Sequence, residues 1–271
     1  MVTLVCFLKM GVRTMKTIVV ANQKGGVGKT TVAVNLGAGL ARRNRKVLLI
    51  DLDAQCNATQ VLYRMLGEGE PGMCEILLNE GSLASVVVPT KQENLFLAPA
   101  GESLANADLN LAAMMGRELF LRNLLAPVRD QYDYAIIDTG PYLGLLTVNA
   151  LVAADFVVVP VSCEFLPLLG LKFLLETVRK VRDKLHPQLK VLGYVITMYD
   201  RRESITFQVE QTLLDHFGDE VFKSRIRINT KQKGAPSKAQ TIFDYENSDQ
   251  GKGTVDFESL ADEVLARAEG G

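Results

Sequence analysis

The chain has 271 residues, of which 48% are hydrophobic and 23% are charged. This composition is typical of a globular protein with a sizeable core, and it excludes a disordered chain. The formal net charge of −1 gives no global sign of a nucleic-acid or membrane partner, so any such surface must be a local patch. The four cysteines form no CxxC pair and lie far from the two histidines, which disfavours a zinc site.

No apolar run approaches the roughly 20 residues that a membrane-spanning helix needs, and the first fourteen residues lack a small-residue cleavage site. These features predict a cytoplasmic protein. Methionines stand at positions 1, 10 and 15, and the first strand begins only after the third of them. We therefore expect residues 1–14 to be a loose N-terminal extension or a misassigned start, and residues 15–271 to form a single domain.

Apolar, β-branched runs of strand length occur at residues 17–21, 47–50, 95–98, 134–137, 156–159 and 191–197. Segments with helical periodicity lie between them, at residues 31–42, 118–128, 168–185 and 205–217. Continuous apolar strands that alternate with helices predict an α/β fold, with a mainly parallel twisted sheet and helices on both faces. Ligands of such sheets bind at the carboxyl ends of the strands, so the chemistry should gather at that edge.

The segment 22–31 reads NQKGGVGKTT and connects the first strand to the first helix. Its three glycines let backbone N–H groups close around phosphate oxygens at the positive end of a helix. Lys29 is placed to reach the β- and γ-phosphates, and the Thr30 hydroxyl to ligate magnesium. Gln23 replaces the usual first glycine of this motif, and a second lysine, Lys24, stands just inside the loop. The predicted nucleotide-binding residues of the loop are Lys24, Gly25, Gly26, Val27, Gly28, Lys29, Thr30 and Thr31.

The run KGGVGKTT resembles the phosphate loop of the ParA/MinD superfamily, the deviant Walker-A P-loop ATPases. VLLIDLDAQCNAT at 47–59 resembles a segment that reads close to VLLIDLDPQGNAT in partition ATPases, and YDYAIIDTGPYLGLLTVNAL at 132–151 resembles their Walker-B strand and switch. The segments VPVSCEFLPLLGL, ITMYDRR and INTKQKGAPS follow in the family's order. The similarity covers roughly residues 16–268, is closest to ParA/Soj-type proteins, and implies a P-loop NTPase fold that uses ATP and Mg²⁺.

The resemblance also assigns roles to individual side chains. It implies that Asp53 positions or activates the attacking water, and that Asp51 helps to order magnesium-bound water. Asp138 ends an apolar run as a Walker-B acid does, and would hold magnesium through water. Lys29 would stabilise the γ-phosphate oxygens, while Lys24 would act across the interface of a homodimer bridged by ATP. The predicted catalytic residues are therefore Lys24, Lys29 and Asp53, and the predicted metal site is Thr30, Asp51 and Asp138.

The sequence departs from the family pattern in two places. Gly140 stands where partition ATPases commonly carry the first proline of Asp-x-Pro-Pro, and Tyr142 stands where a small residue is usual. We expect these changes to alter the kinetics of the switch rather than nucleotide binding. The run Arg227-Ile228-Asn229 differs from the family's Pro-Arg-Asn, and the resemblance would place Asn229 at the adenine edge of the nucleotide.

Cations gather in the C-terminal third, where eight lysines and arginines but only five acids lie between positions 201 and 238. Charge counting alone favours a solvated face. The resemblance instead puts ITMYDRR and INTKQKGAPS on a face that contacts DNA. Binding to phosphates would be sensitive to salt and nearly blind to sequence. The predicted DNA-binding residues are Arg201, Arg202, Arg225, Arg227, Lys231 and Lys233.

The favoured function is that of a ParA-like ATPase that dimerises on ATP, binds nucleoid DNA non-specifically and segregates chromosome or plasmid DNA with a ParB-like or other activating partner. The alternative is a related ATPase that positions an organelle or protein cluster. A MinD-like membrane cycle would need a basic amphipathic helix at the C-terminus, and it is disfavoured because the polar face of residues 255–271 carries mostly acids. An iron–sulfur ATPase would need two convergent cysteines, and only Cys163 lies suitably near a strand end. A nucleotide-binding module without hydrolysis is disfavoured by the presence of Lys24, Lys29 and Asp53.

Overall fold

The computed structural model describes residues 14–79, 81–163 and 167–270. The expected loose extension at residues 1–14 lies outside this range apart from Thr14. The strands are β1 (Lys16–Val20), β2 (Val47–Leu52), β3 (Val88–Pro89), β4 (Leu95–Ala98), β5 (Tyr134–Thr139), β6 (Phe156–Ser162), β7 (Lys190–Tyr199) and β8 (Val221–Arg227). The α-helices are α1 (Lys29–Ala41), α2 (Asn57–Leu62), α3 (Met73–Leu78), α4 (Ala107–Ala112), α5 (Phe120–Leu125), α6 (Leu145–Ala153), α7 (Pro167–Lys184), α8 (Ser204–Phe217), α9 (Thr230–Gly234), α10 (Ile242–Glu246) and α11 (Lys252–Glu269). Short 3₁₀ helices are η1 (Leu83–Ser85), η2 (Glu102–Asn106), η3 (Ala126–Val128), η4 (Gly218–Glu220) and η5 (Ala235–Lys238).

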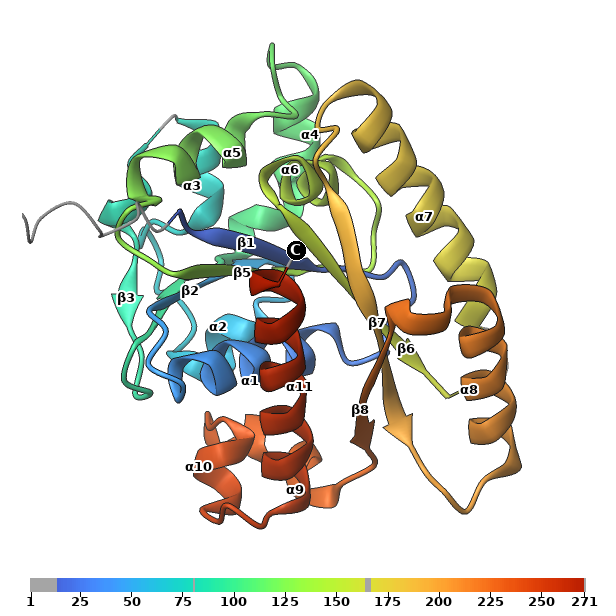
Figure 1. The fold of residues 1–271 in the computed structure, drawn as a ribbon. Coiled ribbons are helices and arrows are strands. Elements are labelled where there is room, and N and C mark those ends of the chain that lie inside the picture. The colour runs from blue at the N-terminus through green and yellow to red at the C-terminus, as the bar shows by residue number, and fades with distance from the viewer. Residues whose placement is uncertain (1–13, 80, 164–166, 271) are drawn as a thin grey trace, which may run out of the picture.

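Within the described residues, the eight strands form one sheet in the order β3-β4-β2-β5-β1-β6-β7-β8 (Figure 1). All neighbouring pairs are parallel except β3 and β4. The predicted α/β fold with a mainly parallel sheet is therefore confirmed. Two strands were not predicted. The first, β3, is a two-residue edge strand, and β8 alternates buried apolar residues with lysine and arginine, which breaks the apolar run.

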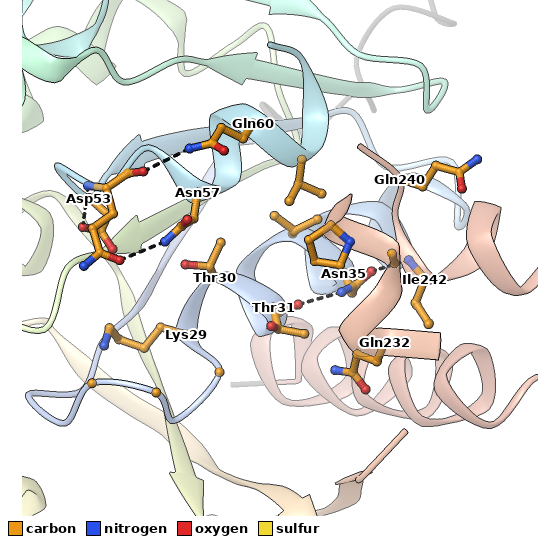
Figure 2. A pocket seen from close by; sticks show the side chains of 18 of the residues that line it. Lys29, Thr30, Thr31, Asn35, Asp53, Asn57, Gln60, Gln232, Gln240 and Ile242 are labelled. Carbon is orange, nitrogen blue, oxygen red and sulfur yellow. Dashed lines mark hydrogen bonds between the residues drawn. The ribbon is translucent and has the colours of Figure 1, made fainter. Parts of the chain in front are cut away.

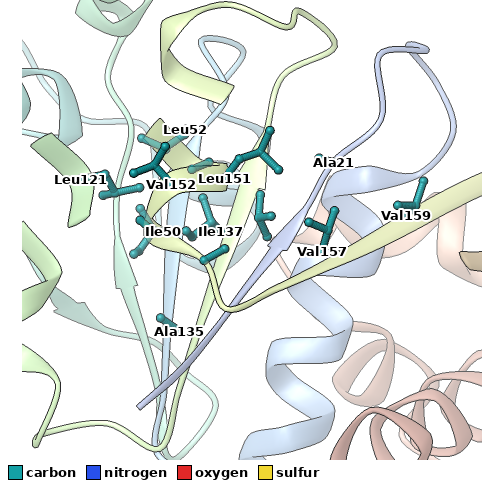
Figure 3. Packing of buried hydrophobic residues seen from close by; sticks show 14 of the residues in the cluster. Ala21, Ile50, Leu52, Leu121, Ala135, Ile137, Leu151, Val152, Val157 and Val159 are labelled. Atoms are coloured by element: carbon teal, nitrogen blue, oxygen red, sulfur yellow. The ribbon is translucent and has the colours of Figure 1, made fainter. Parts of the chain in front are cut away.

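Helices cover both faces of the sheet because successive strand residues point to opposite sides. Val19 of β1 packs in one apolar cluster with α3, α5, α6 and α7, whereas Ile18 packs in the other with α1, α2, α10 and α11. Figure 3 shows part of the first cluster, with Leu121 from α5, Leu151 from α6 and Ile137 from β5. Burial on both sides explains why the central strands read as continuous apolar runs.

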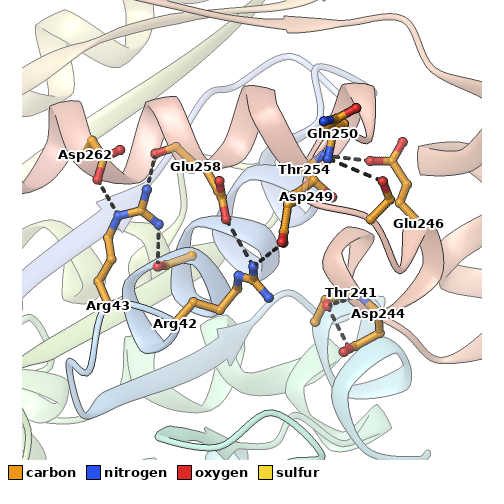
Figure 4. A network of polar contacts seen from close by, with 12 residues as sticks. Arg42, Arg43, Thr241, Asp244, Glu246, Asp249, Gln250, Thr254, Glu258 and Asp262 are labelled. Atoms are coloured by element: carbon orange, nitrogen blue, oxygen red, sulfur yellow. Dashed lines mark hydrogen bonds and ion pairs between the residues drawn. The ribbon is translucent and has the colours of Figure 1, made fainter.

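The C-terminal end of α1 is tied to α11 by a polar network (Figure 4). Arg42 bonds to Glu258 at 3.1 Å, and Arg43 donates to the Glu258 carbonyl at 2.9 Å. Deeper in this contact, a Cβ atom at Gly39 would lie 3.0 Å from Cβ of Ala261, so glycine permits the close approach of the two helices. The partly exposed ion pairs add little stability each, but together they fix the helix that begins at the phosphate loop.

The connections that follow the neighbouring central strands β1 and β5 run toward opposite edges of the sheet. From β1 the chain runs through α1 to β2, and from β5 it runs through α6 to β6 on the other side of β1. Because α1 and α6 cover opposite faces, the loops that follow β1 and β5 diverge. A crevice at the carboxyl ends of strands is the usual ligand site of such a sheet.

Candidate active site

The loop between β1 and α1 has the backbone that a phosphate cradle requires. Gly26 and Gly28 have φ angles of 76° and 85°, in the left-handed region that other residues rarely adopt. A Cβ atom at Gly25 or Gly26 would meet no atom within 4 Å, so the space beside the loop is open. The loop leads directly into the 13-residue helix α1, whose N-terminus carries positive charge suited to an anion.

Hydrogen bonds to the neighbouring strands β6 and β7 hold this loop in place. The Asn22 amide donates to the Pro160 carbonyl of β6 at 2.7 Å, and its oxygen accepts from the Lys24 N–H at 3.0 Å. From β7, the Thr197 hydroxyl donates to the Val27 carbonyl at 2.8 Å. Sequence reasoning missed Thr197, although it lies in the ITMYDRR segment that resembles partition ATPases. Its anchoring role depends on a contact between residues 170 positions apart.

A cavity of about 450 Å³ opens beside the loop. Figure 2 shows Lys29, Thr30 and Thr31 on α1, with Asp53, Asn57 and Gln60 on one side and Gln232, Gln240 and Ile242 on the other. A second cavity of about 260 Å³ shares Gly28, Thr31 and Met198 with the first and extends toward the end of β8. The two cavities together offer room for the phosphates and for a base.

Lys29 lies where its charge can act on both the cavity and the acidic residues. Its Nζ donates to the Lys24 carbonyl at 3.1 Å, within the loop itself. Burial lowers the pKa of Lys29, and the negative charges of Asp138 and then Asp53 oppose that change. The structure therefore brings together the predicted lysine and two of the three predicted acids.

Asp138 is the penultimate residue of β5 and is fully buried. Neither of its carboxylate oxygens has a hydrogen bond of good geometry to a described residue, although the Thr30 hydroxyl lies close enough to favour the charged form and oppose a rise in the pKa of Asp138. Burial and the charge of Asp51, its register partner on β2, raise the pKa of Asp138 well above the ordinary value. Buried polar groups are almost always satisfied, so an unpartnered carboxylate beside a phosphate loop fits a hydrated magnesium ion.

Asp51 makes contacts of a different kind. Its carboxylate accepts from the Asp53 N–H at 3.1 Å, and from the N–H and hydroxyl of Thr59 at 2.8 and 2.7 Å. Burial raises the pKa of Asp51 to about 6, although the Thr59 bonds oppose the shift. The Thr59 hydroxyl also accepts the Ala100 N–H at 2.9 Å. Asp51 thus organises the segment that carries Asp53, and its part in ordering magnesium-bound water stays a prediction.

Asp53 follows directly after β2 and borders the large cavity while remaining only 6% exposed. Its Oδ1 accepts the Gln55 N–H at 3.0 Å. No group of three or more His, Cys, Asp or Glu in the described part of the chain could hold a metal ion by itself. The predicted magnesium site of Thr30, Asp51 and Asp138 would therefore need phosphate oxygens and water to complete it.

Asn229, predicted at the adenine edge, lines the second cavity. Its side-chain oxygen caps α9 by accepting the Lys231 N–H at 3.0 Å, and its amide donates to Glu246 at 2.8 Å. Both ends of the amide are thus engaged, so a direct contact with a base would compete with these bonds. The Glu246 carboxylate is in turn held by the N–H groups of Gly253 and Thr254, which ties this region to α11.

The six predicted DNA-binding cations differ in how they are held. Arg225 forms an ion pair with Glu210 at 2.6 Å, and Arg227 forms one with Asp256 at 2.6 Å. Both pairs are partly buried, so these guanidinium groups are engaged in holding β8 to α8 and α11. They would have to break a native ion pair to reach a phosphate.

The other four cations are exposed. Arg202 pairs with Asp200, yet its side chain is 87% exposed. Arg201, Lys231 and Lys233 are exposed and have no ion pair within the described ranges. The turn after β7 and the connection from β8 to α9 lie side by side, since the Ile228 N–H donates to the Tyr199 carbonyl at 3.1 Å. The exposed cations therefore gather at one edge of the sheet.

The cysteines that the structure describes are buried thiols. Burial raises the pKa of Cys56 and of Cys163 to about 11. Iron–sulfur ligation requires thiolates, so this environment adds to the sequence argument against a cluster. Among the described helices, none is long and apolar enough to cross a membrane.

Comparisons with known proteins agree with this site. The sequence model of a family described as an AAA domain matches residues 15–191. The chain is 41% identical over 252 residues to a protein of Treponema pallidum named chromosome-partitioning ATPase Soj, covering 93% of this chain and 98% of that protein. It is 38% identical over 260 residues to the chromosome partitioning protein ParA of Caulobacter vibrioides, covering 95% and 97%.

A solved structure of cobyrinic acid a,c-diamide synthase from Mycobacterium smegmatis, with a bound ATP analogue and magnesium, matches with a TM-score of 0.82 and 32% identity. The match covers 94% of this chain and 96% of that one. This name denotes a different reaction, so the fold alone does not select a cargo. The glycine loop, Lys24, Lys29 and the buried acids, together with the identity to Soj and ParA over nearly the whole chain, show that the protein belongs to the ParA/Soj type of the ParA/MinD superfamily of P-loop ATPases.

Proposed function

We propose that the protein binds ATP with magnesium, dimerises around it and hydrolyses it slowly to segregate DNA at the nucleoid. The observation that carries the proposal is the meeting of four features in one cavity. These are an open glycine loop at a helix N-terminus, Lys29, the unpartnered buried carboxylate of Asp138, and Asp53 at the cavity wall. The matched relatives are named as partitioning proteins, which supports DNA as the cargo.

Each group has a separate task in the reaction. The loop N–H groups and Lys29 bind the β- and γ-phosphates and stabilise their negative charge as the terminal P–O bond breaks. Asp53 orients the attacking water in line with that bond. Thr30 and, through water, Asp138 would hold magnesium, which supplies positive charge to offset that of the phosphates.

Nucleotide binding is tested by titrating the protein with a fluorescent ATP analogue, with and without magnesium. Lys29→Ala is expected to weaken binding at least tenfold, because it removes a buried lysine that lies against both the loop and the acids. Lys190→Ala is the matched control, since this exposed lysine begins β7 at the opposite end of the strand. No binding by the wild type above background would end the proposal.

The dimer is tested with two variants that should act in opposite directions. Asp53→Ala should keep ATP bound but lose the orientation of water, so an ATP-bound dimer accumulates. Lys24→Ala should lose the dimer, because the resemblance gives this lysine a contact across the interface. Light scattering after size-exclusion chromatography distinguishes the two, and a monomeric Asp53→Ala protein saturated with ATP would contradict the sandwich arrangement.

DNA binding is proposed for Arg201, Arg202, Lys231 and Lys233, the exposed members of the predicted set. A dimer would present this edge twice, so binding should require ATP. Each phosphate contact releases counterions, and the affinity should therefore fall steeply with salt and show little dependence on sequence. Arg225 and Arg227 are proposed to stabilise this edge of the sheet, because their ion pairs hold β8 to α8 and α11.

Fluorescence anisotropy on a random duplex, at two salt concentrations, tests this surface. Arg201→Ala and Lys231→Ala are each expected to lower the affinity and to reduce the salt slope by about one. Lys190→Ala again controls for the loss of one charge. Binding that is unchanged in both variants, or that ignores ATP, would remove this surface from the proposed mechanism.

A ParB-like protein is the proposed activating partner, because the relatives are named for chromosome partition. The partner encoded beside the gene should raise ATP turnover several-fold when DNA is present. Turnover that stays at the basal rate with that partner would contradict a partition system of this kind.

A further inference from the structure

Gly140 follows β5 directly and faces the side chain of Asp53. A Cβ atom at position 140 would lie 3.1 Å from Oδ1 of Asp53 and 3.5 Å from its Cγ. The first distance is shorter than an ordinary van der Waals contact, so any side chain at position 140 would make a neighbour move by a few tenths of an ångström. The absence of a side chain is therefore what lets the carboxylate lie against this loop. Its Oδ1 also accepts the Gln55 N–H at 3.0 Å.

The loop at residues 140–144 is held at both ends. Before it, the Thr139 hydroxyl donates to the Val20 carbonyl of β1 at 2.9 Å. After it, the Thr147 hydroxyl of α6 donates to the Tyr142 carbonyl at 2.6 Å. The Asp53 side chain, by contrast, borders the 450 Å³ cavity. A side chain added at position 140 would consequently displace the carboxylate toward the cavity rather than move the loop.

We propose that Gly140 is a positioning residue that gives the Asp53 carboxylate a resting place against this loop and so keeps basal ATP hydrolysis slow. The proposal rests on the function above, in which Asp53 orients the attacking water. In the resting place, the carboxylate is held to the cavity wall by the Gln55 N–H and by contact with Gly140. Moving it toward the cavity brings it closer to the water that it must orient.

Steady-state kinetics of Gly140→Ala provide the first test. The added methyl group should raise kcat for ATP about three- to tenfold, because small changes in the position of a catalytic group have large effects on rate. KM should stay within about twofold of the wild type, since the three nearest atoms to a Cβ atom at position 140 would all belong to Asp53 and none to the phosphate loop. Gly101→Ala is the matched control, because its Cβ would lie 3.6 Å from Leu66 and 3.7 Å from Ser103, which are ordinary contacts. A kcat that is unchanged or lower would overturn the proposal.

A second test measures the coupling between the two residues without relying on activity. The methyl group at position 140 meets Oδ1 of Asp53, and Asp53→Ala removes that atom. The change in melting temperature caused by Gly140→Ala should therefore be more favourable, by about 2 °C, in the Asp53→Ala background than in the wild type. Equal changes in both backgrounds would show that the residues do not act on each other. If Gly140→Ala alone fails to fold, recovery of folding in the double variant supports the same contact, and its failure there overturns it.

The two proposals fail in distinguishable ways. If the wild type neither binds nor hydrolyses ATP, the proposed function itself is wrong. If the wild type hydrolyses ATP and Gly140→Ala has the same kcat, only the role of Gly140 is wrong.

Discussion

Replacing Asp138 by asparagine is expected to stabilise the nucleotide-free protein and to abolish its response to magnesium. The carboxylate is fully buried, and neither oxygen has a hydrogen bond of good geometry to a described residue. Asparagine has nearly the same shape but cannot ionise, so it removes the cost of burying a charge or of retaining a proton. Leaving a buried polar group unpaired costs about 1–3 kcal/mol, and more for a charged one. We expect a gain of about 2 kcal/mol, or about 4–8 °C in melting temperature for a chain of this size.

This gain should increase with pH. The pKa of Asp138 is raised in the folded protein, which therefore keeps a proton that the unfolded chain has already released. Stability from this group is present below the unfolded pKa, near 4, and is lost as the pH rises toward the folded pKa. Asp51 contributes with the same sign, because its pKa of about 6 places the loss between about pH 4 and 6. Asparagine at position 138 also removes a negative charge that faces Asp51. Because protonation removes the same charge from the wild type, the stabilities of the wild type and the variant should converge at low pH.

Thermal and urea denaturation at pH 5 and pH 8, in EDTA, measure this difference. Asp219→Asn is the control, because it makes the same change at an exposed acid. A second series adds ATP with and without magnesium. Ligand at about 100 times its Kd should stabilise the wild type by about 2.7 kcal/mol, and Asp138→Asn should lose the magnesium-dependent part of this increment. A variant that is less stable than the wild type in EDTA, or that keeps the full magnesium increment, would refute the reasoning.

Two further substitutions test contacts that hold the site together. Thr197→Val removes the hydroxyl that donates to the Val27 carbonyl. It should weaken ATP binding about fivefold, which is equivalent to about 1 kcal/mol. Unchanged affinity in a nucleotide titration would mean that the loop does not need this hydrogen bond. Thr59→Val leaves the Ala100 N–H without its acceptor and removes one hydrogen bond to Asp51. Urea denaturation should therefore show that the free energy of unfolding falls by about 2–4 kcal/mol. A decrease below about 0.5 kcal/mol would contradict the buried arrangement.

The resemblance and the local pattern were sufficient to find the phosphate loop and most of the sheet. Six of the strands were predicted because a strand buried on both faces must be apolar throughout, which is visible in a short window. The glycines of the loop were equally visible, since the left-handed backbone at Gly26 and Gly28 admits few other residues. These features depend on neighbours along the chain, so no knowledge of the tertiary contacts was needed.

Contacts between distant segments decided the rest. Charge counting treated Arg225 and Arg227 as equivalent to Arg201, yet the fold pairs the first two with acids and leaves the third exposed. In the same way, only the packed structure shows that Thr197 anchors the phosphate loop. A hydrogen bond or an ion pair depends on distances of a few ångströms between groups that can be any number of residues apart, and those distances exist only once the strands have been ordered in the sheet.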